Sequence, residues 1–124
     1  MSQKVLVVDD DPVVIKMVKS FLTTHGIEVV WAADGLDALV KIKKEKPQLV
    51  VLDIMMPEVN GYDVCYQLRF NPDFEQIPII ILTVREKEID DFISKRTNID
   101  YLQKPVELQL LLTKIQSLLG KAEK

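Results

Sequence analysis

Apolar and polar positions along the chain predict short strands and helices in regular succession. Five apolar runs are rich in branched aliphatic residues and contain few polar ones. This is typical of strands in a parallel sheet that is covered on both faces. The predicted strands are residues 4–8, 28–32, 49–53, 77–83 and, with a weaker pattern, 101–103.

Helical segments are predicted between and after these runs, because apolar residues recur there at helical spacing. The predicted helices are residues 12–25, 35–45, 61–71, 86–96 and 107–119. Pro12 suits the first turn of its helix, and Gly26 suits the C-terminal cap. Five strand–helix units with right-handed crossovers predict an α/β protein, with a doubly wound sheet and helices on both faces.

Length and composition narrow the class of protein further. The 124 residues suit one domain, expected to span 1–120, with 121–124 as a tail or the start of a linker. A net charge of −3 argues against a nucleic-acid-binding surface. The single cysteine, Cys65, excludes an internal disulfide and favours a cytoplasmic protein. Neither a signal peptide nor a membrane-spanning apolar run is expected.

Polar residues stand where four of the five predicted strands end, and that edge is where such sheets bind ligands. They are Asp9, Asp10 and Asp11, then Asp53, Thr83 and Lys104 followed by Pro105. Of these, Asp11 suits the N-cap of the helix that follows it.

The side chains at the strand ends would together form a site that suits a metal ion and phosphoryl transfer. Two carboxylates about 5 Å apart repel by roughly 3 kcal/mol at an effective dielectric near 20, so three of them need a cation. Oxygen ligands suit Mg²⁺, whereas zinc would need a Cys/His cluster that the chain lacks. A metal, a lysine, a hydroxyl and a spare carboxylate together indicate phosphoryl transfer, in which the carboxylate itself can be the nucleophile.

The combined motifs resemble the receiver domain of two-component response regulators over the whole chain. They read "VLVVDDDP", "LVVLDIMMPEVNGYDV", "PIIILT" and "DYLQKP". The resemblance implies a flavodoxin-like (βα)5 fold with sheet order 2-1-3-4-5. It also implies a signalling domain that catalyses only its own phosphorylation and dephosphorylation.

By this resemblance Asp53 is the phosphoacceptor and one of the Mg²⁺ ligands. Asp10 would bind Mg²⁺ directly, Asp9 would help through a water molecule, and the backbone carbonyl of Met55 would be the third protein ligand.

The same resemblance assigns the remaining site residues. Thr83 would hydrogen-bond the phosphoryl group, Lys104 would pair with its charge, and the Lys104–Pro105 peptide bond would be cis. Thr83 and Tyr101 would form the switch, with the hydroxyl moving toward the phosphate and the ring turning inward.

Partners are implied as well. The phosphoryl group would come from a sensor histidine kinase or a phosphotransfer protein, since the chain's own His25 is not a donor candidate. The surface of segments 86–96, 101–103 and 107–119 would regulate a downstream protein or a fused output domain. A phosphorylation-dependent homodimer is a further expectation. The domain itself is expected to contact neither nucleic acid nor a membrane directly.

Several positions depart from the family pattern. Val84 replaces a small residue and is expected to slow attack by water on the phosphate, so that Val84→Ala would speed its loss. Thr97-Asn98 stands before the last predicted strand, where Gly-Ala is common in the family, so the sequence does not predict the conformation of that turn. Val106 and Leu110 lie off the core stripe of the last helix and are proposed as partner or dimer contacts.

Three other functions are alternatives to the receiver. "VVDDDPVV" also resembles the entry motif of haloacid-dehalogenase-type phosphatases, with Asp9 as nucleophile and Asp11 as acid/base, but this leaves Asp53 unexplained. A flavodoxin would need a phosphate loop that "DDDP" would repel. A receiver that binds partners without being phosphorylated is the third alternative.

Overall fold

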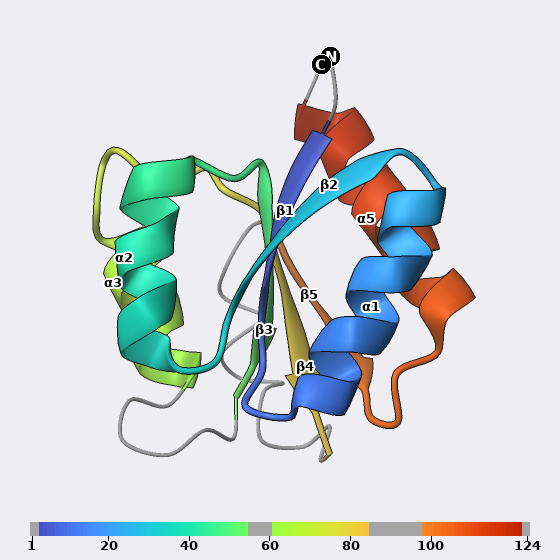
Figure 1. Ribbon diagram of the computed structural model, residues 1–124. Coiled ribbons are helices and arrows are strands. Elements are labelled where there is room, and N and C mark those ends of the chain that lie inside the picture. The colour runs from blue at the N-terminus through green and yellow to red at the C-terminus, as the bar shows by residue number, and fades with distance from the viewer. Residues whose placement is uncertain (1–2, 55–60, 85–97, 123–124) are drawn as a thin grey trace.

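The computed structural model describes residues 3–54, 61–84 and 98–122, and Figure 1 shows a central sheet between two layers of helices. The five parallel strands have the order β2-β1-β3-β4-β5, which confirms the flavodoxin-like fold class. The strands are β1 (Gln3–Val8), β2 (Ile27–Ala32), β3 (Leu49–Asp53), β4 (Ile79–Thr83) and β5 (Ile99–Gln103). The described helices are α1 (Pro12–Thr24), α2 (Gly35–Glu45), α3 (Gly61–Arg69) and α5 (Leu108–Ala122).

Two apolar clusters, one on each face of the sheet, form the core. Successive side chains of β1 alternate between them: Val5 and Val7 pack with α1 and α5, and Leu6 and Val8 with α2 and α3. Strands β3 and β4 are buried along their whole length, as their continuous apolar runs predict. The predicted helix 86–96 lies outside the described residues. None of the described helices is long and apolar enough to cross a membrane.

Local sequence signals fix the ends of α1. The Asp11 carboxylate accepts a hydrogen bond of 2.9 Å from the backbone N–H of Val13, which confirms its predicted role as an N-cap. At the other end Gly26 follows the C-cap residue His25 with φ of +79°, a left-handed conformation that favours glycine. These caps determine how the chain leaves β1 for α1 and turns back into β2.

The structure corrects several predicted boundaries. Strands β1 and β2 each begin one residue earlier than predicted, α1 ends one residue earlier, and the last helix is Leu108–Ala122 rather than 107–119. Helix α3 ends at Arg69 rather than 71, because Asn71 begins a turn in which its carbonyl accepts from the N–H of Phe74. Strand β4 begins at Ile79 rather than 77, since the N–H of Ile77 bonds to Phe74 in the same turn. Strand β5 is longer than 101–103 and pairs with β4 from Ile99 onward.

The turn into β5, which the sequence left open, is made by an asparagine. Asn98 has φ of +62°, a left-handed conformation that asparagine tolerates better than most residues. Its carbonyl accepts from the N–H of Ile79 at 2.9 Å and from the Arg69 guanidinium at 3.3 Å. Asn98 therefore supports the turn without a glycine.

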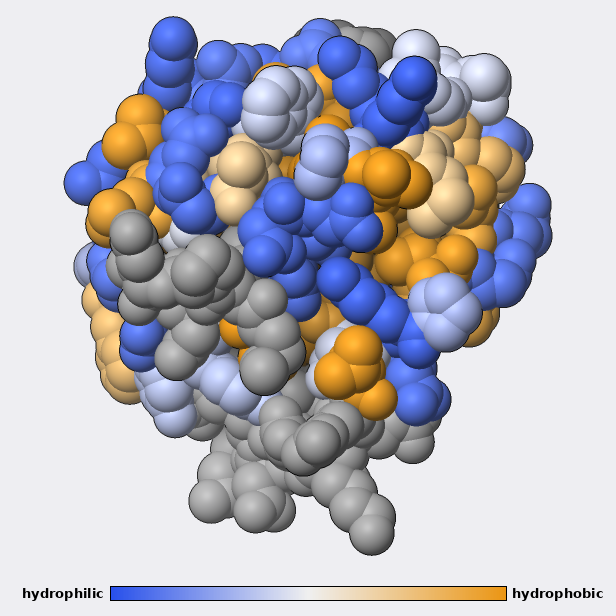
Figure 2. Space-filling model, turned by 60° about the horizontal axis from the view of Figure 1, so that its bottom comes forward, coloured by the Kyte–Doolittle hydropathy of each residue, from blue (hydrophilic) through white to orange (hydrophobic). Residues whose placement is uncertain are grey.

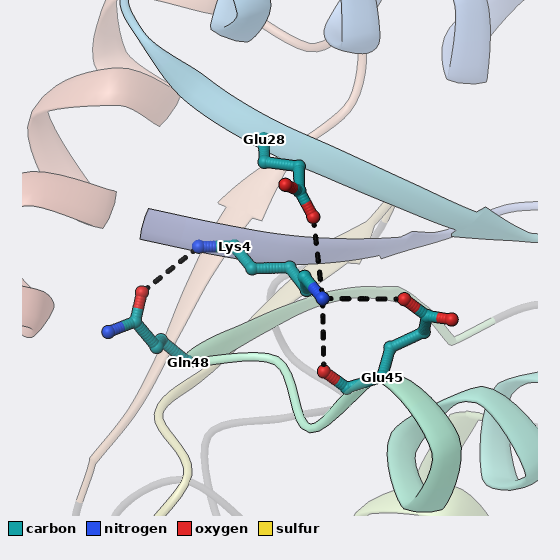
Figure 3. A network of polar contacts seen from close by, with 4 residues as sticks. All are labelled: Lys4, Glu28, Glu45 and Gln48. Carbon is teal, nitrogen blue, oxygen red and sulfur yellow. Dashed lines mark hydrogen bonds and ion pairs between the residues drawn. The ribbon is translucent and has the colours of Figure 1, made fainter. Parts of the chain in front are cut away.

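Lys4 joins three elements at the N-terminal edge of the sheet (Figure 3). Its backbone exchanges hydrogen bonds with Gln48, which precedes β3. Its ammonium lies 3.4 Å from a carboxylate oxygen of Glu28 on β2 and 3.4 Å from one of Glu45 at the end of α2. This network is at the opposite end of β1 from the predicted site.

Candidate functional site

The three predicted carboxylates of the site converge. Asp9 directly follows β1, Asp53 ends β3, and these two strands are neighbours in the sheet. Asp9, Asp10 and Asp53 each offer an oxygen, and these oxygens lie within 4.8 Å of one another. Asp9 is 1% and Asp53 3% exposed, whereas Asp10 is open to solvent. The sheet thus holds two buried acids and one exposed acid in one small space.

Lys104 supplies positive charge to this group. Its ammonium lies 2.9 Å from Asp9 Oδ2 and 3.4 Å from Asp53 Oδ2. Burial lowers the pKa of Lys104, but the nearby carboxylates of Asp9 and Asp53 outweigh burial and raise that pKa above its ordinary value. The residue's backbone N–H donates to the carbonyl of Thr83 at 2.7 Å, and the Lys104–Pro105 peptide bond is cis, as predicted.

The charge and chemistry of the cluster fit a divalent cation. Three carboxylates and one ammonium leave a formal charge of −2. Asp9 Oδ1 accepts from the backbone N–H of Asp11, and its buried Oδ2 lies 2.9 Å from the Lys104 ammonium. An oxygen-only donor set of this charge suits Mg²⁺. Met55, the further ligand predicted from the sequence, lies outside the described residues.

Thr83 and Tyr101 occupy the neighbouring strands. Asp53 pairs in register with Leu82 of β4, so Thr83 stands one residue beyond it, and Thr83 is 1% exposed. Tyr101 on β5 is half-buried and packs against the core cluster on the α2–α3 face. Val84, directly after Thr83, is 55% exposed. The switch role of Thr83 and Tyr101, and the effect of Val84 on phosphate lifetime, stay predictions.

Gly61 is a structural part of the site that was not among the residues predicted for it. A Cβ atom on Gly61 would lie 2.6 Å from the carbonyl oxygen of Asp53 and 2.6 Å from Cα of Ile54. Its N–H also donates to the carbonyl of Ile54 at 2.9 Å. The start of α3 is therefore held directly against the backbone that carries Asp53. The Asn60-Gly61 pair was the only sequence signal for this contact.

The two proposed contact residues near α5 differ from each other. Leu110 is 43% exposed, whereas Val106 is partly buried against the core cluster beneath α1 and α5. Leu110 borders a surface cavity of about 510 Å³ that Tyr101 and the Asp100–Lys114 ion pair also line. Leu110 is thus available to a partner, and Val106 is less so.

Figure 2 shows the face at which the strands end, with hydrophilic side chains gathered at its centre. Apolar areas flank this centre on both sides. Among the exposed large hydrophobic residues, Val13 and Met17 belong to α1, and Leu36 and Val40 belong to α2. The face at which the strands end therefore has a polar centre between apolar areas.

Comparison with known proteins identifies the family of this chain. The family model of the response regulator receiver domain matches residues 5–116. The chain belongs to this family. As a receiver domain it is 37% identical over 118 residues to Protein PilH of Pseudomonas aeruginosa, covering 94% of this chain and 98% of PilH.

Other relatives of this receiver domain are longer or are solved structures. It is 35% identical over 124 residues to the alkaline phosphatase synthesis transcriptional regulatory protein PhoP of Bacillus subtilis, covering 99% of this chain and 51% of PhoP. The chain spans about half the length of several curated relatives that it matches. The structure of the chemotaxis response regulator CheY4 of Vibrio cholerae superposes with a TM-score of 0.86 at 30% identity, covering 95% of this chain and 99% of CheY4.

Proposed function

We propose that this receiver domain is a switch of two-component signalling, activated by Mg²⁺-dependent phosphorylation of Asp53. The observation that carries the proposal is the buried carboxylate of Asp53 at the end of β3, within 4.8 Å of two further acids and 3.4 Å from the Lys104 ammonium. A rigid strand end that holds one acid beside a fixed ammonium, in a cluster whose remaining negative charge suits a divalent cation, favours acyl phosphate formation.

The transfer step makes one bond and breaks one. An oxygen of Asp53 attacks the phosphorus of a phosphohistidine on a histidine kinase or phosphotransfer protein, the P–N bond breaks, and the imidazole leaves with the electron pair. Mg²⁺ bound by Asp9, Asp10 and Asp53, with the Met55 carbonyl, would neutralise charge on the phosphoryl oxygens. Lys104 would pair with one of these oxygens, and the Thr83 hydroxyl would donate to another.

Phosphorylation would then bias the surface that includes β5 and α5. The Thr83 hydroxyl would be drawn toward the phosphoryl group, and the half-buried Tyr101 ring would turn further inward. Because Tyr101 and Leu110 border the same surface cavity, this change would alter a contact surface for a downstream protein or an attached output domain. A phosphorylation-dependent homodimer through the same surface is part of the proposal.

The phosphatase alternative fits the arrangement less well. It requires Asp11 as an acid/base, but the Asp11 carboxylate caps α1 through Val13. It also gives no role to Asp53, which is 3% exposed beside Lys104. The receiver proposal uses both residues as they are placed.

Intact mass after incubation with Mg²⁺ and acetyl phosphate tests the proposal. We expect one added phosphoryl group on the wild type and none on Asp53→Asn. Exposed Asp63→Asn, on α3, is the matched control and should be phosphorylated like the wild type. An adduct that survives in Asp53→Asn but is lost in Asp9→Asn would instead favour the phosphatase. The absence of an adduct on the wild type, even with a phosphorylated kinase as donor, would contradict phosphorylation altogether.

A further inference from the structure

A cavity beside the acidic cluster has no role in the proposed function. Its volume is about 490 Å³, within the range of small-molecule sites, and it lies between α1 and the edge strand β2. The side chains around it come from both elements and from the end of β1. They are Asp9, Asp10, Pro12, Ile15, Lys16, Lys19, Trp31 and Ala33. We call this cavity the α1–β2 pocket.

Trp31 is a preformed wall of the pocket. The Lys41 ammonium lies 4.8 Å from the centre of its ring and donates a hydrogen bond to its backbone carbonyl. Asp37, one turn earlier on α2, pairs with the same ammonium at 3.4 Å. A ring that is covered by a fixed cation loses little further freedom when a ligand packs against it.

Charge is distributed unevenly along the pocket. Lys16 and Lys19 are exposed on α1, and no carboxylate of the described residues lies within ion-pair distance of either ammonium. Asp9 and Asp10 form the other end, and both also belong to the cluster that fits a divalent cation. With that cation bound the acidic end is neutralised, and the two lysines leave the pocket positive.

We propose that the α1–β2 pocket binds a small organic anion with an aromatic or branched apolar body. The body would pack against Ile15 and Trp31, and the anionic group would pair with Lys16 and Lys19. The pocket's volume of about 490 Å³ accommodates such a molecule, and apolar surface predominates among its walls. The complementary charge of the two lysines selects an anion over a neutral or cationic ligand of the same shape.

The shared acidic end couples this ligand to the metal, so this step rests on the proposed function. Mg²⁺ at Asp9 and Asp10 removes the repulsion between the acids and an incoming anion. Binding of the anion should therefore be tighter with Mg²⁺ than without it, and by linkage Mg²⁺ should bind more tightly when the anion is present.

The test uses two probes with one ring system and opposite charge, 1-naphthylacetate and 1-naphthylmethylamine. Trp31 is the chain's single tryptophan, so its indole N–H gives one resolved side-chain signal in a ¹⁵N-labelled sample. Titrations in Mg²⁺ should shift this signal, with the anion binding about tenfold more tightly than the cation. The Lys16→Ala/Lys19→Ala double variant should weaken anion binding by about tenfold, and Lys44→Ala, an exposed lysine on α2, should leave it unchanged.

Three results would overturn the inference. They are a Trp31 signal that does not respond to 1-naphthylacetate, equal or tighter binding of the amine in Mg²⁺, and equal anion binding by the double variant. Anion affinity that is the same in Mg²⁺ and in EDTA would contradict the coupling between the anion and Mg²⁺ through Asp9 and Asp10. Acetyl phosphate labelling of Asp53 in the same samples separates these failures from failure of the proposed function, because labelling needs neither Lys16 nor Lys19.

Discussion

Two lysines at opposite ends of the sheet each lie between two carboxylates, yet only one of them marks a candidate functional site. Lys4 contacts Glu28 and Glu45 at the N-terminal edge, and Lys104 contacts Asp9 and Asp53 where the strands end. The contacts are of similar length, and the neighbouring acids raise both lysine pKa values above the ordinary one. Neither the distances nor the direction of the pKa shift distinguishes the two groups.

The difference lies in the acids. Side chains of Asp9 and Asp53 are 0% and 4% exposed and follow directly from buried strands. Those of Glu28 and Glu45 are 51% and 29% exposed, on longer and more flexible side chains (Figure 3). Burial and attachment to a rigid strand end convert a charge pair into a preorganised site, because the charges cannot relax away from one another. In water the same pair contributes little.

Lys104→Met should have the largest effect, and it tests directly whether Lys104 and Lys4 differ in function. Loss of the ammonium beside Asp53 removes a preorganised charge from the transferring group. The initial rate of phosphorylation by acetyl phosphate should fall roughly 100-fold. Lys4→Met is the matched control and should phosphorylate at the wild-type rate, measured by intact mass over time. Similar losses in both variants would mean that Lys104 has no special role.

Gly61→Ala should have the next largest effect, because it disturbs the backbone that holds Asp53. The new methyl group would meet main-chain atoms at 2.6 Å, which cannot move as a side chain can. We expect a loss of about 2 kcal/mol in the free energy of unfolding, measured with urea. Gly120→Ala in α5, where a Cβ meets nothing within 4 Å, is the control and should be neutral or stabilising. Equal stability of both variants would show that the contact at Gly61 relaxes freely.

Asp53→Asn should stabilise the fold when Mg²⁺ is absent. It relieves repulsion among three carboxylates of roughly 3 kcal/mol per close pair, partly offset by the lost ion pair with Lys104. The free energy of unfolding in EDTA should rise by about 1 kcal/mol. Glu45→Gln, at the Lys4 end, should change stability in the opposite direction. Destabilisation by Asp53→Asn would contradict the view that the site is strained by excess negative charge.

Lys4→Met should have the smallest effect, a slight destabilisation that salt reduces. The sign of its pH dependence follows from the raised pKa of Lys4. A raised pKa means that the folded state holds the proton more tightly, so the contribution is complete below the ordinary value of 10.5 and is lost as pH rises through the folded pKa. Wild-type and variant stabilities should run parallel near pH 7 to 9 and converge above about 10.5. Convergence near neutral pH would exclude this ion-pair origin.

Sequence reasoning performed best where the apolar pattern was continuous. Strand β3 was predicted at its observed bounds, because four consecutive apolar residues are followed by a single aspartate, and all five residues are buried. Parallel strands bring their ends together at one edge of the sheet, which is why the sequence alone predicts that Asp9, Asp10, Asp53 and Lys104 lie close together. The start of β5 was missed because Asp100 interrupts the pattern, its charge being paired with Lys114.

Features that depend on contacts between distant segments could not be predicted from the sequence. The approach of Gly61 to Asp53 depends on how α3 meets β3, and the glycine alone indicates only a turn. The left-handed conformation of Asn98 could not be predicted without knowledge of the hydrogen bonds that its carbonyl accepts. The α1–β2 pocket joins Lys16 and Trp31 through the packing of a helix on a strand edge, which no local pattern encodes.

Locating the phosphoryl group by residue tests the central claim most directly. An aspartyl phosphate is reduced by borohydride to homoserine, which peptide mass spectrometry can place in the chain. After phosphorylation in Mg²⁺, homoserine should appear at position 53 and at no other acid of the cluster. Homoserine at Asp9 or Asp10, with Asp53 intact, would contradict the assignment of Asp53 as the phosphoacceptor.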